Sequence, residues 1–167
     1  ERALQYDYPA RDKWVLANEY PNVYLNRDQA RGLGIEWRLF LRQAAHRLET
    51  VEGLEKAYIP DELDYADPYY AVYARSVAPG RSGYLIVRAA RDTLIADPLD
   101  KDAHGTPYEY DSQVPLVFWG ADFKTGRSSE TVRVADLAPT VAVPLGLAFK
   151  PQPDSRVLPA LKSLGVQ

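Results

Sequence analysis

A polar stretch in the middle of the chain carries residue types that bind metal ions. It runs from Asp92 to Gln113 and holds His104 directly before Gly105. A neutral imidazole nitrogen is a common zinc ligand, and a glycine beside it leaves room for backbone or metal to approach. Long polar loops in compact domains are usually functional or disordered. The pattern leaves two interpretations of His104: a metal ligand, or an exposed loop histidine.

Two carboxylates shortly after His104 could support its role as a metal ligand. A metal-bound histidine usually donates its other ring N–H to a carboxylate or a carbonyl group, which fixes the ring. Glu109 and Asp111 are candidates for that orienting role. Loop carboxylates also cap turns, and the sequence leaves both roles open. The other histidine, His46, falls on the polar side of an expected helix, which indicates a surface residue.

Hydrophobic spacing predicts the helices around this loop. Apolar residues at spacings of three and four predict a helix over 36–51, and a second helix is expected over 137–147. Asp136 precedes the second helix, where an N-cap is a better interpretation than a catalytic carboxylate. Pro144 lies inside that helix and should kink or shorten it.

Short runs rich in β-branched and aromatic residues predict the strands. They lie at 23–25, 54–59, 83–90, 114–120 and 130–134. The run 114–120 is almost wholly apolar, which favours a strand buried on both faces. Because strands and helices alternate, the fold class is α/β, or α+β for an isolated piece. Residues 1–22 show no clear period and are expected to be an irregular lead-in to a single domain spanning 1–167.

The composition excludes several classes of protein. The net charge is −3 and the basic residues are scattered, so no surface for nucleic acid is indicated. No apolar run approaches the roughly 18 residues that span a membrane. Without cysteine, disulfides and thiolate metal sites are excluded. The sequence also lacks Met, even at position 1, which favours a processed or excised piece over a complete protein that lost a tag.

The segment around His104 resembles a known family. The run His-Gly-Thr-Pro-Tyr-Glu-Tyr-Asp at 104–111, with Val-Pro-Leu at 114–116 and Gly120 after it, resembles a segment of the alkaline phosphatase superfamily. The similarity is closest to its type I phosphodiesterase/nucleotide pyrophosphatase-like branch. Asp-Leu-Ala-Pro-Thr at 136–140 and Arg-Ser-Gly at 81–83 are similar to further segments of this superfamily.

The resemblance implies the carboxy-terminal part of a two-metal phosphoester hydrolase. In that family the matching histidine is the last ligand, in chain order, of one of two catalytic metal ions, usually zinc, so His104 would bind one ion. The nucleophile and the remaining ligands belong to upstream motifs, which this chain lacks. The chain alone is therefore expected to contain no catalytic residue, bind no zinc and be inactive. The phosphate ester substrate and the amino-terminal catalytic half belong to the parent protein.

The expected architecture is the carboxy-terminal portion of an alkaline-phosphatase-like αβα core, a mixed sheet flanked by helices. Its face toward the missing half would be apolar, and such patches favour self-association. Before His104, Asp102 and Ala103 replace the Gly-Thr or Gly-Ser that is usual in relatives, which alters the backbone freedom of the loop. Relatives are commonly exported, so the resemblance implies a periplasmic or secreted parent.

Two alternative functions accompany this interpretation. A sulfatase or phosphonate hydrolase of the same superfamily would share the segments found here, because the discriminating residues lie upstream. A non-catalytic binding module that kept the fold and lost the site is the alternative from another class. The preference for phosphate monoesters or diesters is not encoded in this region.

Overall fold

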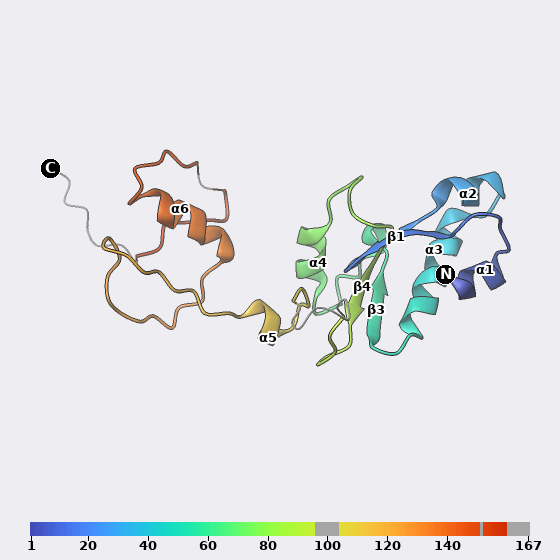
Figure 1. Ribbon diagram of the computed structural model, residues 1–167, viewed down its shortest axis with the longest axis horizontal. Helices are drawn as coiled ribbons and strands as arrows, with labels where there is room; N and C mark the ends of the chain where they lie inside the picture. Colours follow the sequence, from blue (N-terminus) through green and yellow to red (C-terminus); the bar gives the residue numbers. More distant parts are fainter. Residues whose placement is uncertain (96–103, 151, 160–167) are drawn as a thin grey trace. The chain divides into compact units, whose positions relative to one another are not determined.

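The computed structural model describes residues 1–95, 104–150 and 152–159. The chain divides into two compact units, Glu1–Val114 and Pro115–Gln167. Both are drawn in Figure 1. The single domain that the length favours stays a prediction.

The first unit is built on a four-stranded antiparallel sheet. Its strands are β1 (Val15–Glu19), β2 (Asn22–Leu25), β3 (Leu54–Tyr58) and β4 (Leu85–Ala89), in the order β1-β2-β4-β3. Three of the predicted strands are therefore present, and the α/β class is confirmed. The described strand pairs are all antiparallel, whereas a mixed sheet was expected.

One face of the sheet is covered by α3 (Trp37–Glu49), which confirms the helix predicted over 36–51. The helix begins where the Glu36 carboxylate accepts the backbone N–H groups of Arg38 and Leu39. Its apolar stripe buries Phe40 against Trp14, with ring centroids 4.6 Å apart. His46 is exposed on the opposite side, as predicted.

The other face of the sheet is covered by α4 (Tyr70–Ser76), which comes after the short 3₁₀ helix η1 (Pro60–Glu62). Figure 1 shows α3 and α4 on opposite sides of the strands. Side chains alternate along β4, so Leu85 and Val87 join the α3 core while Ile86 packs with Tyr58 and Tyr73. All five β4 residues are buried, which makes β4 a rigid support for the loop at its carboxyl end.

The expectation of an irregular lead-in over 1–22 is not met. These residues form α1 (Arg2–Asp7) and β1, and Trp14 is fully buried. The Glu1 carboxylate ties the two together, because it accepts the backbone N–H groups of Trp14 and Val15. Helix α2 (Arg27–Gly32) follows β2, and its amino-terminal end is capped by the side chain of Asn26.

The second unit contains η2 (Val134–Asp136) and α6 (Leu137–Ala142). The helix predicted over 137–147 ends before Pro144, as that proline requires. Asp136 takes the N-cap position of α6, as predicted, but its buried carboxylate accepts the backbone N–H groups of Arg133 and Arg156 and makes no capping hydrogen bond to α6. These two bonds lower the pKa of Asp136 and mark it as a structural residue.

The predictions of two strands after Gln113 are wrong. Residues 114–120 and 130–134 form no strand, and the side chains of Val117 and Trp119 are 80% and 95% exposed. An apolar run can become a buried strand only where partner strands pair with its backbone, and the described residues supply none for these runs. Among those residues, no helix is both long and apolar enough to cross a membrane.

Candidate functional site

The segment that carries His104 is closed by a hydrogen-bonded clasp. The Asp111 carboxylate accepts both the backbone N–H and the hydroxyl of Thr106, at 3.0 and 2.7 Å. Asp111 belongs to α5 (Glu109–Ser112), a single turn. The Thr106 hydroxyl and N–H lower the pKa of Asp111. The clasp therefore favours an ionised Asp111 beside the histidine.

Two tyrosines connect the same segment to the end of β4. The buried Tyr108 hydroxyl has two acceptors, the Glu55 carboxylate on β3 and the Ala89 carbonyl, 2.8 Å away on β4. The Tyr110 hydroxyl accepts the backbone N–H of Asp92 at 3.0 Å. The segment is thus held by a rigid strand pair although it is itself a loop.

A charge network is built around the buried Arg88 and reaches Tyr108 through Glu55. The Arg88 side chain is 7% exposed and pairs with Glu55 at 3.4 Å and with Asp67 at 3.5 Å. It also donates to the Tyr58 hydroxyl, which in turn donates to Asp67. Desolvation lowers the pKa of Arg88, but Tyr58, Glu55 and Asp67 raise it by more, so the guanidinium stays charged.

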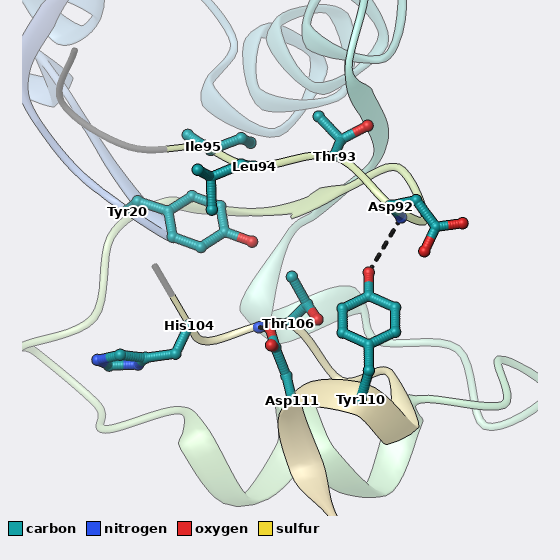
Figure 2. A pocket seen from close by; sticks show the side chains of 9 residues that line it. All are labelled: Tyr20, Asp92, Thr93, Leu94, Ile95, His104, Thr106, Tyr110 and Asp111. Carbon is teal, nitrogen blue, oxygen red and sulfur yellow. Dashed lines mark hydrogen bonds between the residues drawn. The ribbon is translucent and has the colours of Figure 1, made fainter. Parts of the chain in front are cut away.

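A small pocket of about 160 Å³ lies beside the clasp. Figure 2 shows the Tyr20 ring facing it from the turn between β1 and β2, and the His104 imidazole extending away from Asp111. Gly105 has φ +108, and a Cβ there would lie 3.7 Å from the Tyr20 ring. The pocket lining combines hydroxyls, carboxylates and apolar groups: Tyr20, Asp92, Thr93, Leu94, Ile95, His104, Thr106, Tyr110 and Asp111.

The candidate site residues take different places. His104 is exposed and lies at the pocket with Asp111. The Asp111 carboxylate accepts hydrogen bonds from Thr106. Glu109 is an exposed residue at the start of α5. Within the described part of the chain, no hydrogen bond joins the imidazole to either carboxylate, so their orienting role stays a prediction. Asp102 and Ala103, which depart from the family pattern, lie outside the described residues.

The residues present fit a single metal ligand better than a whole metal site. A catalytic zinc ion needs about three protein ligands. Among the described residues, no group of three or more His, Cys, Asp or Glu side chains is arranged to hold an ion. An exposed imidazole on an anchored loop fits one donor position of a site whose other ligands come from elsewhere.

The comparisons place this architecture in a class. Two crystal structures of the alkaline phosphatase PafA, wild type and a mutant, align with 89% of this chain and 29% of theirs. Their TM-scores are 0.75 and 0.73, at 23% and 22% sequence identity. The chain therefore has the fold of part of an alkaline phosphatase. At this identity the likeness shows the fold alone.

One curated protein also matches by sequence. It is a calcium-transporting ATPase of Myroides odoratus, 27% identical over 135 residues, which are 76% of this chain and 24% of that protein. No family model matches the chain. The chain thus spans about a quarter of the length of the relatives it resembles.

Sequence reasoning missed one residue that lines the pocket and two that support the loop. Tyr20, Glu55 and Arg88 lie far along the chain from His104, in segments that carry no motif. Tyr108 lies inside the His-Gly-x-Pro-Tyr-x-Tyr-Asp run, and its presence there was the one available signal. Its role depends on Glu55, a partner 53 residues away, so it becomes visible only in the fold.

Proposed function

We propose that this chain is the carboxy-terminal part of a metal-dependent phosphoester hydrolase. The observation that carries the proposal is the position of the run 104–111. In a chain with the fold of part of an alkaline phosphatase, this run forms a clasped loop anchored at the end of β4. The names of the matching proteins, an alkaline phosphatase and an ATPase, both denote hydrolysis at phosphorus.

His104 is the proposed metal ligand of this chain. Its imidazole is exposed, and its loop is fixed by Asp111, Tyr108 and Tyr110. In the parent protein, a pair of bound metal ions, which we expect to be zinc, would supply charge stabilisation at the phosphoryl group. The residues of this chain position the ligand. The clasp and the two tyrosines hold the loop, so that the His104 imidazole can bind an ion without reorganisation of the loop.

The exposed apolar run 114–119 supports a longer parent. Val114, Val117 and Trp119 are all largely exposed within this one short run, and contiguous exposed apolar patches mark interaction surfaces. The proposed occupant of this surface is the amino-terminal half of the same protein, which would also provide the nucleophile and the other ligands. This assignment agrees with the chain matching only 29% of PafA.

Activity measurements on the longer protein and on this chain test the proposal. With zinc present, the longer protein should hydrolyse p-nitrophenyl phosphate or bis-p-nitrophenyl phosphate, while the 167-residue chain should show background rates. Hydrolysis of p-nitrophenyl sulfate in preference to both phosphate esters would favour the sulfatase alternative. The absence of all three activities in the longer protein would favour a binding module.

A further inference from the structure

The phenol of Tyr108 occupies an unusual place for a loop side chain. Tyr108 is 3% exposed although its neighbours Glu109 and Tyr110 are exposed. Its hydroxyl carries one proton, which can go to only one acceptor at a time. Both acceptors, the Glu55 carboxylate and the Ala89 carbonyl, belong to the sheet. The hydroxyl can therefore bind the loop to either of two neighbouring strands, β3 or β4, from one point.

The Glu55 acceptor is itself held in place. Its carboxylate pairs with the Arg88 guanidinium at 3.4 Å, and Arg88 is bound by Asp67 and Tyr58 on its other side. The series of contacts runs from Asp67, just before α4, through Arg88 and Glu55 to Tyr108. A charged acceptor makes a stronger hydrogen bond than a neutral one. The Arg88 guanidinium thus helps to hold one of the two acceptors of the Tyr108 hydroxyl in place.

The Tyr108 ring has contacts that do not depend on the hydroxyl. It packs edge-on against Tyr69, with centroids 5.6 Å apart, and lies 5.5 Å from the Tyr110 ring. The Arg91 guanidinium lies over its face at 4.7 Å. Replacing Tyr108 by Phe should therefore leave the ring in place and remove only the link between loop and sheet.

We propose that Tyr108 is a positioning residue whose hydroxyl fixes the backbone that carries His104 against β3 and β4. This inference rests on the proposed function, because it is the metal ligand that is being positioned. The clasp between Asp111 and Thr106 closes the loop on itself, and the Tyr110 bond lies at a half-exposed side chain. Tyr108 supplies the buried connection from this segment to the sheet.

Amide hydrogen exchange on the 167-residue chain tests the link directly. In Tyr108→Phe, exchange of the Asp111 and Ser112 amides, both bonded to the Tyr108 carbonyl, should accelerate roughly tenfold, the effect of one lost hydrogen bond. The Val87 amide, bonded to Pro21 in the sheet, should keep its wild-type rate. Tyr24→Phe is the matched control, because it removes a hydroxyl bond to the Arg81 carbonyl on another part of the sheet.

Two results of the exchange experiment would overturn the inference. Unchanged exchange at Asp111 and Ser112 would show that the hydroxyl does not hold the segment. Equal acceleration at Val87 would show that Tyr108 stabilises the whole unit and has no special role at the loop.

Release of zinc from the longer protein to a chromogenic chelator tests the consequence for the metal. In Tyr108→Phe, one zinc ion should be released roughly tenfold faster, because the backbone that carries its ligand has lost one hydrogen bond to the sheet. Tyr24→Phe should behave as wild type. If His104→Ala loses an ion and Tyr108→Phe releases zinc at the wild-type rate, this inference alone fails. If His104→Ala retains both ions, the proposed function itself fails.

Discussion

The Asp111 carboxylate accepts both the backbone N–H and the hydroxyl of Thr106 through the same oxygen, Oδ2. The two bonds bridge five positions of the chain and close the segment after His104. Because both donors stabilise the charged form, they lower the pKa of Asp111. The clasp is therefore strongest when the carboxyl group is ionised, and acid should open it.

The first prediction concerns this pH dependence. A carboxyl group whose folded pKa lies below its unfolded value, about 3.9 for Asp, stabilises the fold above that value. The contribution is lost as the pH falls through the lowered folded pKa. The NMR shift of the Thr106 amide should follow this titration, with a midpoint below about 3.9. Thr106→Val, which removes the hydroxyl donor, should move the midpoint upward, whereas Thr106→Ser should not. Identical midpoints in wild type and Thr106→Val would contradict this assignment.

The second prediction concerns the buried charge of Arg88. Arg88→Met leaves Asp67, whose side chain is 13% exposed, without its ion pair, and should cost about 3–5 kcal/mol of unfolding free energy. Arg31→Met is the control, since Arg31 and Asp28 also pair at 3.5 Å but are 75% and 89% exposed. It should cost at most about 1 kcal/mol.

Urea unfolding followed by tryptophan fluorescence measures both variants. Trp119→Phe should be present in every sample, so that only Trp14 and Trp37 of the first unit report. Equal losses for Arg88→Met and Arg31→Met would show that burial of the Arg88 network has no energetic consequence.

The third prediction concerns the entry to β4. A Cβ on Gly83 would lie 2.7 Å from both the backbone N and O of Val23, so Gly83→Ala must push β2 and β4 apart. Its expected cost is about 1–3 kcal/mol, as for other overpacked sites. Gly32→Ala is the matched control, because a Cβ on Gly32, the last residue of α2, would meet no atom within 4 Å. The same urea experiment applies, and a Gly83→Ala variant as stable as Gly32→Ala would refute the close approach.

Much of the first unit could be predicted from local pattern. The spacing of apolar residues identified α3, and β-branched and aromatic runs identified β2, β3 and β4. β1 was missed because three apolar residues, Val15 to Ala17, are followed by two polar ones, so no alternation of apolar and polar residues marks it. It is held by backbone pairing with β2, and backbone hydrogen bonds do not require particular residue types.

The errors after Val114 have a different physical origin. The run 114–120 has the composition of a buried strand, yet burial requires partners that the described residues do not provide. The composition of a segment shows that it is suited to a buried strand, but the strand forms only where another strand pairs with it. For the candidate site, the motif located His104 and Asp111. The links from Tyr108 to Glu55 and Ala89 could not be predicted, because they depend on how distant strands pair.

The zinc content of His104→Ala in the longer protein tests the central claim most directly. Atomic emission measurements should find two zinc ions per wild-type molecule and close to one in His104→Ala, because an ion that loses one of about three protein ligands is held too weakly to survive purification. His46→Ala is the matched control, since His46 is exposed on α3, and it should keep both ions. Two ions in His104→Ala, as in wild type and His46→Ala, would contradict the assignment of His104 as a metal ligand.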